Sequence, residues 1–375
     1  MRRWICFLIA VFVFSVFVPV SVADTTEPAF CVMAQGTEFI VAESSSEEWY
    51  NVAGMTKLPA VLTLCLAFDK GLIDAETPIQ VSAKAASIGG PSAFLEKGET
   101  VPAGELIRAA VMISAGDAIC ALYEHAFGSE EVFLSNISLV MKNAGVDKQL
   151  PDCYGTYMTF SCRELIRFGE AALQSPTFMN YCSQKYAVLE HASGRKTELA
   201  SANKLLSTLS GCIGLFTGSS KSDGYCGIFA VKRGETTYLC AVIGAQNSKA
   251  RFDLASRLTE EAFANYKYVP LCSVDEPLIE NYPVTGGDID SIDLYVKEPY
   301  SVLTSKSEGA VQKRVDLPEQ LSAPLDPEFS VGIISFYDGN GTLLCERALY
   351  PEIAIRATGL RETLSQILKM FLNES

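Results

Sequence analysis

The stretch that decides the fold is "NVAGMTKLPAVLTLCLAF", residues 51–68, a short polar turn followed by an almost unbroken apolar run. A helix that is apolar on all sides belongs in a protein interior, so the run predicts a buried helix that ends near Gly71. Pro59 falls in its first turn, where the missing N–H is not needed. Lys57 stands at the start of this helix, one turn after Gly54 and on the same face.

Strand and helix patterns alternate around this run. Residues 30–43 ("FCVMAQGTEFIVAE") predict two short strands around a Gln-Gly turn, and residues 224–245 predict a hairpin. Apolar residues recur with helical spacing in several other segments, which indicates an α/β (α+β) domain. These helical segments are residues 102–129 (two helices joined by a turn), 129–146, 161–175 and 248–266.

The pattern of apolar and turn residues changes after residue 270. Short alternating runs and turn residues fill residues 271–352, and the sequence Asp-Gly-Asn-Gly at 338–341 is a strong hairpin signal. We therefore predict a small all-β domain over 270–352. The mature chain is long for one core, which favours two domains.

The C-terminal tail, residues 357–373, predicts an amphipathic helix. Such a helix either lies in a membrane interface or packs against its own domain. Its charges cancel, so anionic lipid would add little attraction. The apolar face consists of Leu360, Leu364, Ile367, Leu368, Phe371 and Leu372.

The first 23 residues have the pattern of a secretory signal peptide. Arg2 and Arg3 precede an apolar run, Pro19 breaks it, and residues 21–23 (Ser-Val-Ala) form a cleavage pattern. An uncleaved N-terminal anchor is the alternative, although the run is short for a membrane span. In either case we expect the rest of the chain to be exported across the cytoplasmic membrane.

Composition excludes several classes of function. The net charge of −14 becomes −16 when Arg2 and Arg3 leave with the signal, which argues against binding nucleic acid. The chain has only two histidines and no C-x-x-C pair, so we expect no metal site and no cofactor. Eleven of the twelve cysteines follow the signal, many in apolar runs where they act as core residues. One or two disulfides remain the alternative.

Three short motifs follow one another in the predicted α/β part of the chain: "GMTK" (54–57), "SAGDA" (114–118) and "FTGSSKSDGYC" (216–226). They occupy the places of the S-x-x-K, S-x-N and K-T-G motifs of penicillin-binding proteins. Over nearly the whole mature chain, the sequence resembles the D-Ala-D-Ala carboxypeptidase family of low-molecular-weight penicillin-binding proteins. The segments "IGGPSAFLEKGETV" (88–101) and "ASANKLLSTLSGCIGL" (200–215) also resemble the family.

The resemblance implies the architecture and the location of the protein. Residues 28–268 would form a penicillin-binding, serine β-lactamase-like domain, with an antiparallel sheet flanked by helices. Residues 270–352 would form a small β sandwich that holds the first domain away from the membrane. The protein would lie in the bacterial cell envelope, with the C-terminal helix as a possible contact to the membrane surface.

The resemblance also implies a role for each motif position. The first residue of S-x-x-K would be the nucleophile, and the lysine one turn away would take its proton. The second motif would orient this lysine and the substrate amide, and the third would bind the terminal carboxylate and the peptide backbone. The family site positions in this chain are Gly54, Lys57, Ser114, Gly116, Phe216, Thr217 and Gly218.

Three of these positions depart from the family pattern. Gly54 offers no nucleophile, Gly116 no amide and Phe216 no cation. Removing the nucleophile of a serine enzyme costs about a millionfold in rate in the best-studied case. We therefore hypothesise an exported, catalytically inactive family member that binds peptidoglycan stem peptides or an envelope protein, whose identity the sequence does not give.

Two alternatives remain open. An active serine-type carboxypeptidase could use a relocated nucleophile, for which Thr56 and the serines at 44–46 are candidates. A scaffold protein could use its β domain and tail while the cleft serves no purpose.

The motif residues also have purely structural interpretations. Ser114 would cap the helix that starts near Asp117, and Gly218 would be needed where a strand begins. Phe216 would belong to the core, or it would fill the space that a ligand uses. Conversely, Gly54 and Gly116 would widen the pocket.

Overall fold

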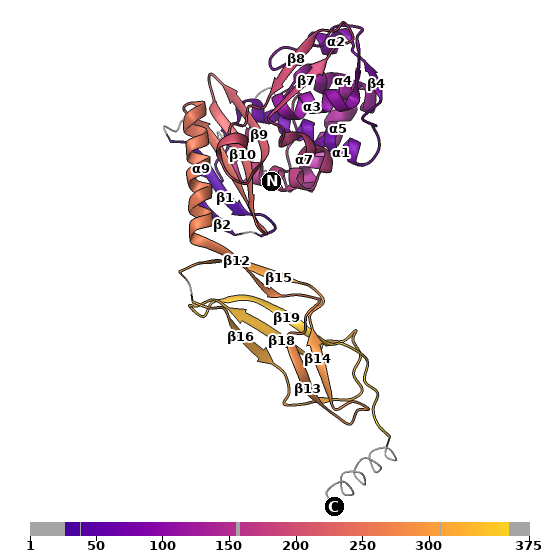
Figure 1. Ribbon diagram of the computed structural model, residues 1–375, viewed down its shortest axis with the longest axis vertical. Helices are drawn as coiled ribbons and strands as arrows, with labels where there is room; N and C mark the ends of the chain where they lie inside the picture. Colours follow the sequence, from indigo (N-terminus) through magenta and orange to yellow (C-terminus); the bar gives the residue numbers. More distant parts are fainter. Residues whose placement is uncertain (1–26, 38, 155–157, 308, 360–375) are drawn as a thin grey trace, which may run out of the picture.

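The computed structural model describes residues 27–359 apart from residues 38, 155–157 and 308. The predicted signal peptide and nearly all of the predicted C-terminal helix lie outside the described residues. An α/β body is followed along the chain by an all-β body, which Figure 1 shows one above the other. Within the described ranges, no helix combines the length and the apolar character needed to cross a membrane.

The α/β body is built on a five-stranded antiparallel sheet in the order β2-β1-β11-β10-β9. The two long inner strands are buried along nearly their whole length, which explains why their apolar runs are continuous rather than alternating. Strand β9 forms one edge of the sheet. The strands are β1 (Ala29–Ala34), β2 (Ile40–Ser44), β9 (Cys212–Ser220), β10 (Gly224–Arg233) and β11 (Thr236–Ala245).

Helices cover both faces of this sheet. The last helix of the body, α9 (Ser248–Asn265), packs on one face, and α6 (Cys162–Leu173) packs on the other (Figure 1). The remaining helices lie elsewhere in this body, most of them in a cluster beyond α6. They are η1 (Ala53–Lys57, a 3₁₀ turn), α1 (Leu58–Asp69), α2 (Ala83–Ala86), α3 (Ala103–Ile113), α4 (Gly116–Phe127), α5 (Glu130–Asn143), α7 (Pro176–Cys182) and α8 (Leu205–Thr208).

Helix α1 is the buried helix that residues 51–68 predict. Most of its side chains are buried, and it contacts α3, α4, α5, α6 and α7. Pro59 lies in its first turn, and Gly71 follows its end with a φ of 69°, as expected for a helix terminator. The predicted strands and helices of the α/β body are thus confirmed, including the antiparallel sheet between helices.

Three short strand pairs complete the α/β body. Each joins segments of the helical cluster and closes a loop on its surface. They are β3 (Tyr50–Asn51) with β6 (Thr159–Phe160), β4 (Pro78–Gln80) with β5 (Thr100–Pro102), and β7 (Tyr186–Glu190) with β8 (Lys196–Ala200).

The all-β body consists of the pair β12-β15 and a six-stranded sheet in the order β16-β18-β19-β14-β13-β17. Side chains from both sheets share one hydrophobic core. The hairpin β18–β19 turns at residues 338–341, as the sequence predicts. The strands are β12 (Tyr266–Cys272), β13 (Ile279–Thr285), β14 (Ser291–Tyr295), β15 (Tyr300–Ser305), β16 (Gln312–Asp316), β17 (Leu321–Ser322), β18 (Gly332–Tyr337) and β19 (Leu343–Pro351).

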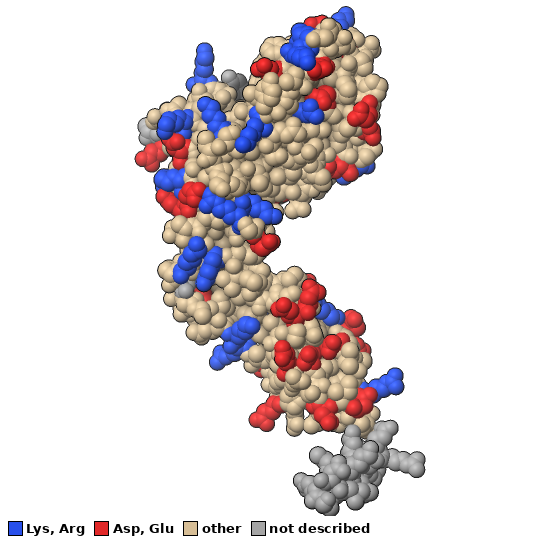
Figure 2. Space-filling view, in the orientation of Figure 1, with Lys and Arg blue, Asp and Glu red and all other residues tan. Residues whose placement is uncertain are grey.

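The eleven cysteines in the described part of the chain are all free thiols, and nine of them are buried. They pack as small core residues, and burial raises the pKa of thiols such as Cys31 to about 12. Charged side chains are distributed unevenly over the surface. Figure 2 shows many acidic side chains gathered on the visible face of the all-β body, whereas basic side chains concentrate near the junction between the bodies.

Candidate functional site

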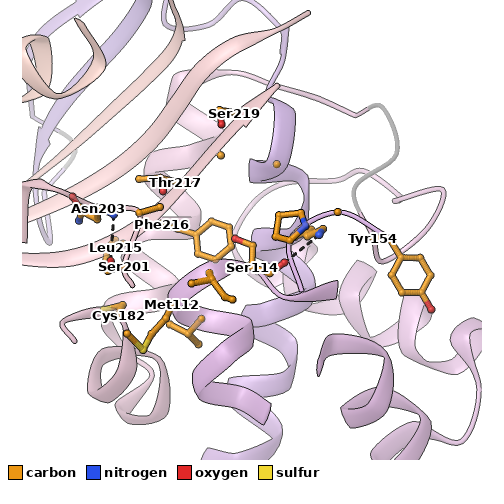
Figure 3. Close-up of a pocket in the computed structure, with 18 of the residues that line it drawn as sticks. Met112, Ser114, Tyr154, Cys182, Ser201, Asn203, Leu215, Phe216, Thr217 and Ser219 are labelled. Carbon is orange, nitrogen blue, oxygen red and sulfur yellow. Dashed lines mark hydrogen bonds between the residues drawn. The ribbon is translucent and has the colours of Figure 1, made fainter. Parts of the chain in front are cut away.

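A pocket of about 340 Å³ lies along strand β9, between this strand, the turn η1 and the junction of α3 with α4. Figure 3 shows its lining side chains. Six of the seven predicted site positions line it. They come from three segments of the chain, and the first and last of these segments are more than 150 residues apart. These six are Gly54, Lys57, Ser114, Phe216, Thr217 and Gly218. The seventh, Gly116, is buried directly beside them.

Lys57 is held inside this site rather than in solvent. Its side chain is buried, with the residue only 5% exposed, and its Nζ donates a hydrogen bond to the carbonyl oxygen of Ser114 at 3.1 Å (Figure 3). Burial lowers the pKa of Lys57 because it disfavours the charged form, while the nearby Asp117 carboxylate opposes this effect. The lysine of the first motif therefore points into the pocket.

Ser114 ends α3 in the left-handed conformation, with φ 56° and ψ 37°. This backbone directs its carbonyl to Lys57. Helix α4 begins at Gly116, and its N-cap is Ala115 without a side-chain hydrogen bond. The interpretation of Ser114 as the cap of this helix is thus wrong, because Ser114 lies one residue too early and in a conformation that caps the preceding helix.

Gly54 is the position at which the first motif predicts the nucleophile. A Cβ atom there would be 3.4 Å from the Cα of Gly218 and 3.7 Å from the backbone nitrogen of Ser219, which is ordinary van der Waals contact. The position could therefore carry a side chain, and its absence leaves open space against β9.

Gly218 is required by close packing. A Cβ on this residue would lie 2.3 Å from the backbone nitrogen of Met55, a distance that real atoms do not reach. Gly218 is the seventh of the nine residues of β9, well past its start. The interpretation that a strand entry needs this glycine is thus wrong, because the close approach of β9 to η1 requires it.

The space beside Gly116 is occupied. A Cβ there would be 2.7 Å from Cγ2 of Ile88 and 3.5 Å from Nζ of Lys57. The expectation that Gly116 widens the pocket is therefore wrong, because the side chain of Ile88 fills the space that an asparagine would use.

A buried carboxylate fixes the loop that carries Ile88. Asp117 is 1% exposed and accepts hydrogen bonds from the hydroxyl of Ser92 (2.6 Å) and from the backbone nitrogens of Ala93 (3.0 Å) and Leu95 (3.1 Å). These bonds compensate the cost of burying the carboxylate. They also position the neighbouring residues Gly89, Gly90 and Pro91 at the pocket wall.

Phe216, the position at which the third motif predicts a cation, forms an apolar wall of the pocket. The residue is 2% exposed and packs with the main hydrophobic core, and it also lines the pocket. In Figure 3 its ring extends from β9 toward Ser114. Both predicted interpretations therefore hold together: the ring is core and it fills part of the cleft, yet a pocket remains beside it.

The structure adds a cation that the motifs do not indicate. Arg251 reaches the pocket from α9, is 4% exposed, and donates from Nη1 to the carbonyls of Gly218 (3.1 Å) and Cys226 (2.7 Å). Within the described chain, its buried Nε has no hydrogen-bond partner. Burial lowers the pKa of Arg251 to about 10. Its only sequence signal is a charge between two apolar residues, Ala250 and Phe252, in a predicted helix.

Further polar residues of the pocket come from segments outside the motifs. Ser201 and Asn203, which follow strand β8, line one side of the pocket, whereas Tyr154 lies on the opposite side and Ser219 of β9 lines a further part (Figure 3). The first two belong to the segment at 200–215 that resembles the family, so the flanking resemblance was the signal that could have found them.

The candidates for a relocated nucleophile lie elsewhere. The hydroxyl of Thr56 donates to the carbonyl of Ala53 at 3.1 Å, and Thr56 lines a second hollow of about 390 Å³ on the other side of Gly54. The hydroxyl of Ser46 donates to Glu43. None of the serines at 44–46 lines either of these two hollows.

A search of the described residues for His, Cys, Asp or Glu side chains placed to hold a metal ion finds no group of three or more.

Comparisons with known proteins agree with this architecture. A family model described as "D-alanyl-D-alanine carboxypeptidase" matches residues 18–247, and one described as "Penicillin-binding protein 5, C-terminal domain" matches residues 266–354. The D-alanyl-D-alanine carboxypeptidase DacF of Bacillus subtilis is 26% identical over 318 residues, which cover 81% of this chain and 79% of the relative. DacC of Escherichia coli is 24% identical over 338 residues, covering 86% and 82%.

Solved structures show the same fold. Penicillin-binding protein 5 of Haemophilus influenzae superposes with a TM-score of 0.74 at 19% identity, covering 88% of this chain and 97% of that one. Penicillin-binding protein 6B of Escherichia coli superposes with a TM-score of 0.69 at 20% identity, covering 88% and 94%. Because the first family model spans well over half of the sequence, the chain belongs to the D-alanyl-D-alanine carboxypeptidase family of low-molecular-weight penicillin-binding proteins.

Proposed function

We propose that this protein acts in the cell envelope by binding peptidoglycan stem peptides without hydrolysing them. The observation that carries the proposal is the combination of a pocket that keeps Lys57 and Thr217 with a glycine, Gly54, at the place of the nucleophile. A glycine cannot form an acyl-enzyme, since it has no atom that could attack a carbonyl carbon. Rate acceleration from binding alone is small beside the contribution of the nucleophile.

The other two departures support the loss of catalysis. Phe216 puts a buried ring where the family has a cation, and Ile88 fills the place of the amide beside Gly116. Both replacements are packed, so the site has adapted to them. A side chain that is built into the core in this way cannot easily be exchanged for the functional group of the family.

The pocket retains features suited to an extended peptide. Strand β9 is the edge of its sheet, and its residues Thr217, Gly218 and Ser219 line the pocket. An exposed strand edge offers backbone hydrogen bonds to an added peptide strand. Lys57 and Arg251 supply positive charge at the same pocket, which suits an acidic ligand.

A labelling experiment tests the proposal. The mature protein, from residue 24, should form no covalent adduct with a fluorescent penicillin and should release no D-alanine from a D-Ala-D-Ala pentapeptide. The Bacillus subtilis relative DacF serves as a positive control for both assays. Titration of the mature protein with stem peptides should in contrast show saturable binding.

The alternatives are distinguished by the same experiment. An adduct located on a serine or threonine by mass spectrometry would establish an active enzyme with a relocated nucleophile. Neither an adduct nor peptide binding would leave the scaffold function, in which the all-β body and the tail make the contacts.

A further inference from the structure

We infer that the pocket selects a stem peptide that has already lost its last D-alanine, with the new terminal carboxylate lying at Gly54 against Lys57. The inference rests on the proposed function, because it names which peptide this same site takes. The ligand would be the product of a carboxypeptidase reaction rather than its substrate, so the protein would recognise trimmed wall peptides.

The first reason is the volume beside Gly54. A peptide that ends one residue earlier has a carboxylate where the longer peptide has an amide group, and the second carboxylate oxygen takes the place of the amide nitrogen. In a site with a serine, the hydroxyl occupies the place in front of that carbon. Gly54 leaves this place open, and a Cβ here would be only in ordinary contact with β9. A negatively charged carboxylate therefore meets no hydroxyl oxygen in front of its carbon at this place.

The second reason is the positive charge beside this place. Lys57 and Gly54 lie one turn apart in η1, and both line the pocket. An ammonium group has three donors, and the structure describes one acceptor for this one, the carbonyl of Ser114. A polar side chain at position 116 would begin 3.5 Å from Nζ and could accept a hydrogen bond from it. Because this residue is a glycine, no side chain there competes with a ligand for the ammonium group. Donors of Lys57 thus remain for a carboxylate of the ligand.

The third reason is that the pocket lacks a cation at the place where the carboxylate of the longer peptide would lie. In the family pattern the lysine of K-T-G binds this terminal carboxylate, and here that position is Phe216, which is 2% exposed. A carboxylate placed against its ring would lose hydration without gaining a partner, which is unfavourable. The departures at Gly54 and Phe216 therefore both favour a carboxylate one residue earlier along the peptide.

Arg251 is the other cation of the pocket, and it provides the competing possibility. Its Nη1 already serves two carbonyl groups, those of Gly218 and Cys226. If the remaining donors of Arg251 bound the carboxylate of the longer peptide, this peptide would bind as tightly as the trimmed one. The experiment below separates these two outcomes.

The test is a set of calorimetric titrations of the unmodified mature protein with three peptides. These are L-Ala-γ-D-Glu-L-Lys-D-Ala, its C-terminal carboxamide, and the pentapeptide that ends in D-Ala-D-Ala. We expect the first to bind about tenfold more tightly than either of the others, as for one charge-assisted hydrogen bond. Equal or tighter binding of the pentapeptide would overturn the inference while leaving the proposed function intact. No binding of any peptide would overturn the proposed function itself.

Substitutions in the pocket then show which residues cause the preference for the trimmed peptide. Lys57→Met should remove the difference between the acid and the carboxamide, and Phe216→Lys should strengthen pentapeptide binding. Lys221→Met, which removes an exposed lysine on the turn after β9, is the matched control and should leave the preference unchanged. A preference that survives Lys57→Met in a protein with an unchanged circular dichroism spectrum would contradict the placement at Lys57.

Discussion

The ammonium group of Lys57 donates a hydrogen bond to the carbonyl oxygen of Ser114, 57 residues away in the sequence, at 3.1 Å. This bond connects the first two motifs of the predicted site. It also buries a charge, because Lys57 is 5% exposed. The effect of this buried charge on the free energy of unfolding can be measured separately from its effect on peptide binding.

Replacing Lys57 by methionine should stabilise the protein at neutral pH. The side chains have similar length, and removing a buried charge whose described partner is a single neutral carbonyl should raise the free energy of unfolding by about 1 kcal/mol. Urea denaturation of both proteins measures the difference.

The stability gain of Lys57→Met should depend on pH. Burial lowers the pKa of Lys57 in the folded protein below the usual lysine value of 10.5. The unfolded chain therefore binds more protons than the folded protein between these two pKa values, and the folded protein gains stability as pH rises through this window. The advantage of the methionine variant should be largest at pH 7 and shrink as pH approaches 10.5. An advantage that is constant from pH 7 to 10.5 would show that Lys57 does not titrate in this way.

Gly218→Ala should destabilise the protein strongly. The added methyl group would meet the backbone nitrogen of Met55 at 2.3 Å, and backbone cannot move aside as a flexible side chain can. We expect a loss of about 3 kcal/mol in the free energy of unfolding, measured by chemical denaturation. Gly89→Ala is the matched control, since a Cβ there meets nothing within 4 Å, and its effect should stay within about 0.5 kcal/mol.

Restoring the family motifs by substitutions at Gly54, Gly116 and Phe216 requires a fourth substitution, at Ile88. Gly54→Ser alone should fold with little change in stability, because the site accommodates a Cβ, and it should remain unlabelled by fluorescent penicillin or nearly so. In the triple variant with Gly116→Asn and Phe216→Lys, the asparagine would collide with Ile88 at 2.7 Å. Adding Ile88→Ala should relieve this contact and give stronger labelling than the triple variant.

The reverse order of labelling would contradict this account of the site. Equal thermal stability of the triple and quadruple variants would likewise show that Ile88 does not obstruct an asparagine at 116. Both quantities come from gel fluorescence and a thermal melt of the same preparations.

Asp117→Ala should loosen the loop that forms the pocket wall. The carboxylate accepts hydrogen bonds from Ser92, Ala93 and Leu95, and removing it leaves buried backbone donors without a partner. We expect a loss of about 3 kcal/mol in the free energy of unfolding. Ser92→Ala, which removes only one of these bonds, should cost about 1 kcal/mol. Hydrogen exchange of Ala93 and Leu95 would report the loosening directly, and unchanged protection would contradict it.

The sequence alone determined much of the fold. The apolar run after Lys57 predicted the buried helix α1, and the strand patterns predicted both the hairpin β10–β11 and the change to an all-β body near residue 270. These predictions held because helices and strands are specified by local periodicity and by turn residues. The three motifs also predicted which distant segments meet at the pocket.

What the tertiary structure decided is how the three altered positions are filled. Residues distant in sequence determine that Ile88 packs beside Gly116, that Gly218 touches Met55, and that Arg251 reaches the pocket from α9. No periodicity carries this information, since contacts between segments depend on three-dimensional packing at near-crystalline density. The sequence thus predicted that the hydroxyl, the amide and the cation of the family pattern are missing. Only packing decided that an open space beside Lys57 remains at Gly54, while apolar side chains occupy the other two places.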